Sequence, residues 1–392
     1  MSPLKKKILQ LSLWSLLDER KVNIIALYDL APKFIYRDSG GDSYGDKIVE
    51  KTFMHGDRKF TIIIKPAIMK TQNGGIIHKF PSRREKMVEL AIRRLSSQRD
   101  RILNINDNNI RFFFSIKEVK DELARINHPY GNKEIREAIV ILNETKITIT
   151  DDDTPRRNIF SSSIFPTVGL KGHDCDESTF VDFNPMIVES IKRINFQQID
   201  YDIITSIKDN IGQWLIKKIY IDNIARSSST YTTSYSEIIR DAELIIWNSK
   251  SNSISRINKT MALLKELGIF NNIDITKVVK KNNYIVNVFY ELHLSDGFIK
   301  SIKKMKEVIG FNNGFYNRIA ARNPKFIEIS EADEALVNRR LRGEALSKKR
   351  LSAALQIGFA PLRAEENEAG IIDGSADPAH GLMSHKKNPR RI

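Results

Sequence analysis

The sequence predicts an α+β, helix-rich fold, and three observations lead to this prediction. Apolar residues recur at helical spacing in several segments, as Met87, Ala91 and Leu95 do. Short runs rich in β-branched and aromatic residues alternate with these segments. The order of helices followed by a two-stranded ribbon then occurs a second time along the chain. This weak internal repeat predicts two units of similar fold.

The composition indicates a folded protein with a polyanionic partner. The chain has 392 residues, of which 41% are hydrophobic, which is enough apolar material for ordinary cores. Its length suggests two or three domains. It carries 63 Lys and Arg against 48 Asp and Glu, a net charge of +15. This excess predicts binding to nucleic acid or to an anionic membrane surface.

The single cysteine, Cys175, excludes an intrachain disulfide framework and zinc sites that need two or more cysteines. A reducing, cytoplasmic location is the simplest expectation. No stretch approaches the roughly 20 uncharged apolar residues of a membrane span. The N-terminal run from Ile8 to Leu17 superficially resembles a signal peptide, but no small-residue cleavage site follows it. It is expected to form a short amphipathic helix or a docking arm.

Four parts are expected along the chain. Residues 1–82 form an N-terminal α/β-hairpin region, in which residues 48–54 and 59–65 flank a turn at Gly56. The first repeated unit covers residues 83–190, and the second covers 191–316. Residues 317–392 form a basic and largely disordered tail, because this part of the chain lacks core-forming residues.

The first unit is predicted as three helices and a two-stranded ribbon. Ser82 with Glu85, and Ser115 with Glu118, have the spacing of capping boxes at the starts of the first two helices. The other predicted features are a strand at 112–114, a third helix capped by Asn132, a ribbon from 146–150 and 158–160 around a turn at 151–155, and a strand at 179–183.

The second unit repeats this order. The sequence predicts a long helix over about 199–224, a second helix whose start at Ser234 mirrors Ser115, and a third helix that begins at a Ser253 cap and ends at Gly268. A ribbon over 269–273 and 284–290 and a last helix over 295–309 follow. The two third helices end alike, in Ile-Leu-Asn-Glu at 141–144 and Leu-Leu-Lys-Glu at 263–266.

Three helices and a β-ribbon make a winged helix, a variant of the helix-turn-helix. In such units the third helix enters the major groove of DNA, and the ribbon, or wing, touches the neighbouring phosphates. Both predicted third helices and both wings carry cations on their outer faces, as phosphate neutralisation requires. The candidate DNA-binding residues are Lys133, Arg136, Arg156 and Arg157 in the first unit, and Ser255, Arg256, Lys259, Lys277, Lys280 and Lys281 in the second.

A pair of cations on a helix is more often simply a solvated face. Four such places in matching positions, on a chain of charge +15, favour DNA. Asn143, Asn258, Asn282 and Asn283 could add base or phosphate contacts, although asparagine is equally common in turns.

The helix-packing patterns resemble those of plasmid replication initiator (Rep) proteins with tandem winged helices. The matching segments, which lie within about residues 80–310, are 81–95, His128–Ile139, Phe183–Ile191, Tyr201 and Trp214–Lys218. The resemblance implies binding to repeated origin sites (iterons), help in opening the duplex, recruitment of the host initiator and replicative helicase, and autorepression as a homodimer. The family's DNA contacts carry over only as positions on the third helices and wings.

Other sites are not supported by their residues. The run Gly40–Lys47 has P-loop glycine spacing, but Asp46 stands where a lysine must meet the phosphates. The seven histidines contain no His-x-His pair of the kind that nicking initiators use with a metal. His173–Glu177 is expected to be a solvated loop, and Asp151–Asp153 a polar turn. No catalytic residue, metal or cofactor is therefore predicted.

The sequence thus predicts a non-enzymatic, sequence-specific binder of double-stranded DNA, namely a plasmid replication initiator that does not nick its origin. One alternative is a transcriptional regulator or autorepressor. Another is a structural or membrane-surface interaction protein, which would bind liposomes and show no sequence preference on DNA. An enzyme such as a primase or nuclease would require a carboxylate metal site, which the sequence does not reveal.

Overall fold

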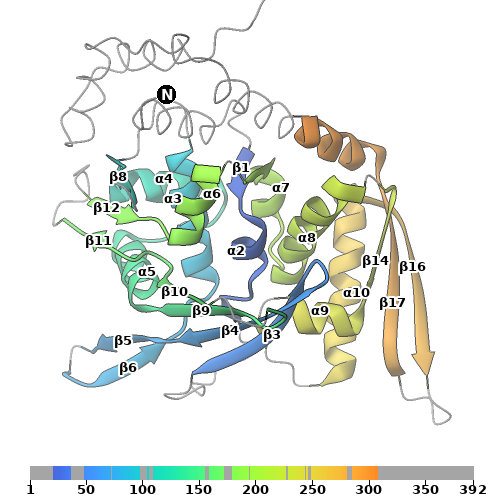
Figure 1. The fold of residues 1–392 in the computed structure, drawn as a ribbon, viewed down its shortest axis with the longest axis horizontal. Helices are drawn as coiled ribbons and strands as arrows, with labels where there is room; N and C mark the ends of the chain where they lie inside the picture. The colour runs from blue at the N-terminus through green and yellow to red at the C-terminus, as the bar shows by residue number, and fades with distance from the viewer. Residues whose placement is uncertain are drawn as a thin grey trace, which may run out of the picture. The chain divides into compact units, whose positions relative to one another are not determined.

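The structure is a computed structural model, and it describes residues 21–36, 48–71, 73–97, 104–105, 109–154, 159–171, 179–193, 195–226, 228–242, 244–245, 249–279 and 285–307. Helices and mostly antiparallel sheets are mixed along these residues, which confirms the predicted α+β class (Figure 1). Several predicted features lie outside the described residues: the N-terminal helix, the Gly40–Lys47 run, Arg156, Arg157, the His173–Glu177 loop, Lys280, Lys281 and the tail over 317–392.

The three helices of the first unit form where the sequence predicted them. They are α3 (Arg83–Ser96), α4 (Ile116–Arg125) and α5 (Asn132–Glu144). Glu85 accepts a hydrogen bond from the backbone N–H of Ser82 (2.9 Å), and Glu118 accepts the equivalent bond from Ser115 (2.9 Å). The cap of α5 is Gly131 rather than the predicted Asn132, because the Glu134 carboxylate accepts a bond from the Gly131 N–H (2.7 Å).

The predicted first wing is part of a larger sheet. The N-terminal hairpin, β3 (Val49–His55) and β4 (Arg58–Lys65), joins β9 (Lys146–Asp151) and β10 (Ile159–Ser163) in the order β10-β9-β4-β3. Ile62 lies opposite Ile149, and Ile64 opposite Ile147, and these side chains are buried. The N-terminal region therefore shares a hydrophobic core with the first unit.

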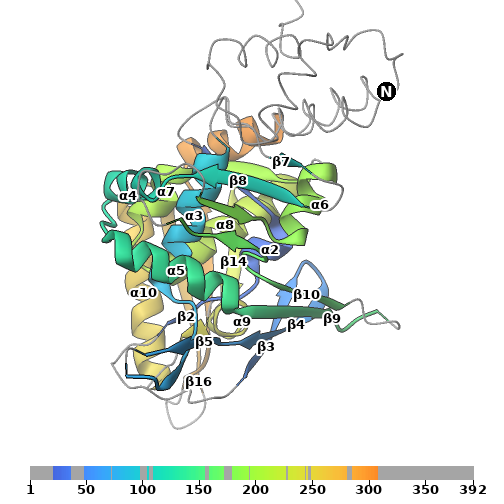
Figure 2. The ribbon, with the colours of Figure 1, turned by 90° about the vertical axis from the view of Figure 1, so that its left-hand side faces the viewer.

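Two smaller sets of strands complete this part. β8 (Ile110–Phe114) pairs with β12 (Thr179–Asp182) and with β7 (Asn104–Ile105), and β12 also pairs with β11 (Val168–Gly169). β5 (Ala67–Lys70) and β6 (Ile76–Lys79) form a two-stranded ribbon that contacts α5 (Figure 2). Helix α6 (Pro185–Arg193) follows β12.

The second unit has the predicted order of helices and ribbon, with one strand between the first two helices that was not predicted. Helix α8 (Asn210–Arg226) is followed by β14 (Thr230–Ser234), α9 (Tyr235–Asp241), α10 (Lys250–Glu266), β16 (Phe270–Val279) and β17 (Ile285–Leu294). The three strands form one antiparallel sheet in the order β14-β17-β16. The predicted last helix is present over residues 296–307. Gly268 ends α10 with a φ of 72°, which favours glycine.

Two helix boundaries differ from the prediction. The long helix expected over 199–224 is divided into β13 (Gln197–Asp200), α7 (Tyr201–Ser206) and α8. The break arises because the carboxylates of Asp200 and Asp209 each accept a backbone N–H of the turn that follows, at Ile203 and Gly212. Helix α10 begins after a Ser249 cap, one turn before the predicted Ser253.

The N-terminal strands connect to both units. β1 (Lys21–Ile24) pairs with β13, β2 (Ile35–Tyr36) pairs in parallel with β15 (Leu244–Ile245), and α2 (Ala26–Leu30) contacts α8. β3 also contacts α9, where the Met54 N–H donates to Asp241 (2.9 Å). No helix among the described residues is long and apolar enough to cross a membrane.

Candidate nucleic-acid interface

Helix α10 and the β16–β17 ribbon form the strongest candidate interface in the second unit. Ile257, Met261 and Leu264 bury the inner face of α10. The hydroxyl of Tyr290 on β17 donates a hydrogen bond to Oδ1 of Asn258 on α10 (2.9 Å). Because apolar packing and this bond act together, the helix and the ribbon are fixed to one another (Figure 1).

The outer face of α10 is exposed, and its side chains are small or polar. It carries Ser251, Asn252, Ser255, Lys259 and Ala262, which recur at helical spacing. Hydroxyl and amide groups bond to base edges, and small side chains let a helix approach the groove floor. Ser255 and Lys259 are predicted residues of this face. Ser251 and Asn252 were missed because the polar run Lys250–Asn252 has no apolar residue to reveal the extra helical turn.

Arg256, another predicted DNA contact, also holds α10 in place. It is half-buried, and its Nε lies 3.1 Å from Oδ1 of Asp209. Oδ2 of the same carboxylate accepts the hydroxyl of Thr260 (2.9 Å) and the N–H of Gly212 in α8 (3.1 Å). Asp209 therefore ties the middle of α10 to the first turn of α8, and Arg256 is part of that connection.

The two faces of the β16–β17 ribbon differ in charge. Lys277 is exposed and lies opposite Val288, so it shares the face that carries Tyr290 and packs on α10. Asp274, Glu291 and His293 lie on the other face, with their ligand-type atoms within 4.8 Å of one another. The pair of His293 Nε2 with Asp274 Oδ2 (2.8 Å) accounts for this grouping without a metal. Because the carboxylates repel phosphate, DNA is expected on the α10 side.

In the first unit, the predicted DNA-facing helix α5 is partly covered. Lys133 in its first turn is exposed, whereas Arg136 and Glu137 are half-buried. Glu137 binds Lys79 of β6 and lies 3.5 Å from Arg84 of α3, and the hydrogen bond from Lys79 holds the pKa of Glu137 below its ordinary value. Asn143 donates to the carbonyl of Phe165 (2.7 Å). The open part of α5 is therefore its N-terminal turn.

The acidic turn of the predicted first wing has a structural role that its sequence did not indicate. Asp151 pairs with Arg58, the hydroxyl of Thr61 donates to Asp152 (2.6 Å), and the N–H of Lys59 donates to Asp153 (2.5 Å). All three carboxylates thus bind the N-terminal hairpin β3–β4. They hold β4 against β9, which explains three adjacent acidic residues on a basic chain.

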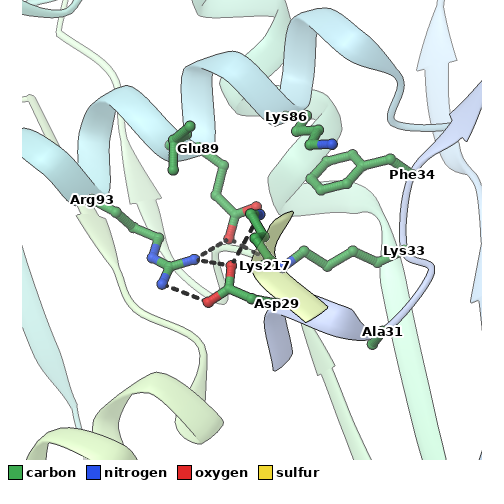
Figure 3. Close-up of a pocket in the computed structure, with 9 residues that line it drawn as sticks. Asp29, Ala31, Lys33, Phe34, Lys86, Glu89, Arg93 and Lys217 are labelled. Atoms are coloured by element: carbon green, nitrogen blue, oxygen red, sulfur yellow. Dashed lines mark hydrogen bonds and ion pairs between the residues drawn. The ribbon is translucent and has the colours of Figure 1, made fainter. Parts of the chain in front are cut away.

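A buried cluster of charged side chains, which was not predicted from the sequence, joins α2, α3 and α8 (Figure 3). Arg93 of α3 binds Asp29 of α2 through Nη1–Oδ1 (2.7 Å) and Nη2–Oδ2 (2.8 Å). Lys217 of α8 lies 3.7 Å from Asp29, and Lys33 lies 3.5 Å from Glu89 of α3. The Tyr28 hydroxyl donates to Glu89 (2.6 Å). No sequence pattern could have revealed this cluster, because its members come from segments that are far apart in the chain.

The cluster shifts the pKa values of its members. Burial alone would raise the pKa of Asp29, but the charges of Arg93 and Lys217 outweigh it and hold that pKa well below its usual range. Burial lowers the pKa of Lys33 to about 8, although Glu89 and Asp29 act in the opposite direction. Burial, followed by the charge of Glu89, raises the pKa of Tyr28. Because these groups lie inside the protein, the cluster is a structural connection and not a DNA-binding surface.

Solved structures to which the chain is similar include the following three. Two structures of domains 2 and 3 of RctB are 10% identical to it. One has a TM-score of 0.38 and covers 68% of this chain and 96% of its own, and the other has a TM-score of 0.39 and covers 70% and 99%. The Pi initiator protein in complex with iteron DNA is 14% identical, with a TM-score of 0.37, and covers 54% of this chain and 91% of its own.

No protein-family profile and no curated protein matches the sequence. TM-scores below 0.5 do not establish a shared arrangement of elements.

Proposed function

We propose that the chain binds duplex DNA in a sequence-specific manner, and that its second unit is a winged helix. One observation carries this proposal: α10 exposes a polar face, and the exposed Lys277 lies on the side of the ribbon that packs on α10. The element order from α8 to β17 and the sheet order β14-β17-β16 support it. In a winged helix these elements place the third helix in the major groove and the wing at the phosphates.

Each group of this surface has a chemical role in the proposal. Ser251, Asn252 and Ser255 read base edges, because hydroxyl and amide groups donate and accept hydrogen bonds in the major groove. Lys259 and Lys277 neutralise phosphates on either side of the helix. Arg256 holds α10 at the angle that this contact needs, through Asp209.

We propose that the first unit is also a winged helix, but one whose ribbon has a different neighbouring strand. Its helices α3, α4 and α5 and its ribbon β9–β10 follow the same order, but the ribbon pairs with β4 of the N-terminal hairpin. Lys133 and Arg136 on α5, together with Arg156 and Arg157 beyond β9, would contact DNA there. Two such units on one chain predict a binding site about two helical turns long.

We further propose that this binding serves replication initiation at a plasmid origin with repeated sites, without nicking or other enzymatic chemistry. The resemblance to Rep proteins supports this role, and so does the charge of +15. Origin opening and recruitment of host proteins belong to the same proposal. An autorepressor would bind the same sites without melting the duplex, so a permanganate-reactivity assay on supercoiled origin DNA distinguishes the two.

Selection of binding sites from random duplexes at physiological salt tests the proposal. We expect a recovered motif, and we expect the Lys259→Ala, Lys277→Ala double variant to lose affinity and to flatten the salt dependence by roughly 0.9 in slope for each lost phosphate contact. Lys304→Ala is the matched control, because Lys304 is an exposed lysine on helix 296–307. Binding without any motif, or equal losses in the control, would contradict the proposal.

A further inference from the structure

The β5–β6 ribbon has two isoleucine side chains that are exposed to solvent. Ile68 is 60% exposed and Ile76 is 64% exposed, although both belong to regular strands. Isoleucine side chains this exposed leave apolar surface in contact with water, which is unfavourable in free energy. The ribbon takes no part in the proposed contacts of α5 and α10 with DNA, so the exposure has another cause.

The isoleucines share one face of the ribbon with cationic and titratable neighbours. Ile68 lies opposite His78, and Lys70 lies opposite Ile76. Cross-strand partners, and residues two apart on one strand, point to the same side. This face is therefore a row of two apolar side chains, one lysine and one histidine. The buried Ala67 lies on the opposite face, toward the body of the protein.

The charge of this segment complements a polyanion. Between Asp57 and Glu85 the chain has no carboxylate, and its cations are Arg58, Lys59, Lys65, Lys70, Lys79, Arg83 and Arg84. Glu137 of α5, the carboxylate bound to the ribbon, is neutralised by Lys79 and Arg84. Arg58, Lys79 and Arg84 pair with carboxylates of the protein itself. The positive charge offered to a partner therefore comes from Lys70 on the isoleucine face and from Lys65 and Arg83 in the flanking chain. The phosphates of DNA supply the matching negative charge.

The ribbon is attached next to the open end of α5. Lys79 at its base binds Glu137, which lies one turn along α5 from the exposed Lys133. The ribbon itself is closed by a turn in which the Thr71 N–H donates to the Gly75 carbonyl (2.8 Å) and the Gly74 N–H to the Thr71 carbonyl (3.0 Å). A duplex that contacts Lys133 thus lies within reach of the ribbon.

We propose that the β5–β6 ribbon is a DNA-binding element that enters the minor groove and presses Ile68 and Ile76 against a base step. Lys70 and His78 lie against the flanking sugars and phosphates. Apolar side chains inserted from the minor groove partly unstack the base pairs they touch. The ribbon would therefore weaken the duplex beside the site bound by α5. This inference rests on the proposed function, and it adds a second, structure-disturbing contact to it.

The test uses full-length protein and the duplex recovered by selection, with 2-aminopurine placed singly at successive positions of the site. We expect wild-type binding to raise fluorescence at one step, and the Ile68→Ser, Ile76→Ser double variant to remove that rise and to weaken binding about tenfold. Ile48→Ser is the matched control, because Ile48 is 54% exposed but lies outside the ribbon. It is expected to behave as wild type, and thermal melting checks that all variants fold.

The outcomes separate the two proposals. If the double variant binds the site and gives the wild-type fluorescence, the ribbon inference is wrong and the proposed function stands. If the double variant keeps the fluorescence but changes the mass of the protein by light scattering, the isoleucines instead cover a second copy of the chain. If wild-type protein selects no site, the proposed function fails and the ribbon inference fails with it.

Discussion

Arg93 binds the carboxylate of Asp29 through two parallel hydrogen bonds, 2.7 and 2.8 Å long, between side chains that are almost completely buried. The same guanidinium donates to the carbonyl of Asn23 (2.6 Å). Lys217 of α8 approaches Asp29 from the second unit. One buried carboxylate therefore links the N-terminal region to a helix of each unit, and this connection sets how α2, α3 and α8 pack.

Replacing Arg93 by Met tests this connection. The change leaves Asp29 buried with Lys217 as its nearest cation, so the free energy of unfolding is expected to fall by about 3–5 kcal/mol in urea titrations. Adding Asp29→Leu should recover part of the loss, because the unpaired carboxylate is then gone. Arg193→Met is the control, since its exposed pair with Glu189 is worth at most about 1 kcal/mol. Equal effects of the two arginine variants would contradict the assignment.

Stability should rise with pH through the titration of Lys33. The pKa of Lys33 is about 8 in the folded protein, against 10.5 for an ordinary lysine, because burial disfavours the charged amine. Between these two values the unfolded chain keeps a proton that the folded chain has released. The free energy of unfolding contributed by Lys33 therefore increases over this window, by up to about 3 kcal/mol.

The measurement compares wild type with Lys33→Met between pH 7.5 and 10 in urea. The wild-type protein should gain stability relative to the variant as the pH rises, since titrating groups outside the cluster act equally on both. A difference that stays constant with pH would show that Lys33 keeps its ordinary pKa.

Local chemistry made much of the fold predictable from the sequence. The boxes Ser82–Glu85 and Ser115–Glu118 cap helices as expected, because both partners lie within one turn. The hairpin at Gly56 and both ribbons also form where β-rich runs flank turn residues. The helix break before Asp209 was missed, because apolar spacing continues across it, from Ile204 and Ile207 to Ile211.

Partners distant in sequence could not be predicted. β4 pairs with β9, and Asp151 pairs with Arg58. The residue pattern of a strand does not indicate which other strand it will pair with. For the candidate site, the exposed Ser255, Lys259 and Lys277 were predicted by face and charge. The contact of Arg256 with Asp209 was not predicted, because the periodicity of α10 carries no information about a carboxylate in the turn before α8.

Two helical glycines should respond in opposite directions to alanine. A Cβ at Gly212 of α8 would lie 2.8 Å from Cγ2 of Ile207 and 3.2 Å from Cγ2 of Thr260 on α10. Overpacking there costs about 1–3 kcal/mol, which exceeds the roughly 1 kcal/mol that alanine gains in helix propensity. At Gly297, in helix 296–307, a Cβ meets nothing within 4 Å.

Gly297→Ala is therefore expected to raise the free energy of unfolding by roughly 0.5–1 kcal/mol, and Gly212→Ala to lower it, as measured by urea unfolding. Stabilisation by both variants would mean that α8 and α10 lie further apart than the close approach at Gly212 indicates.

Arg256 and Lys259 should differ in how they affect DNA binding, although both are cations on α10. Lys259→Ala removes an exposed side chain, so it should weaken binding, flatten the salt slope by roughly 0.9 and leave stability within about 0.5 kcal/mol. Arg256→Ala also breaks the contact with Asp209, so it should weaken binding and lower stability by about 1 kcal/mol.

Asp209→Asn provides the decisive comparison, because it loosens α10 while leaving every cation in place. If Asp209→Asn weakens DNA binding as much as Arg256→Ala without changing the salt slope, Arg256 acts by positioning α10. If Asp209→Asn binds DNA as wild type does, Arg256 contacts the DNA itself.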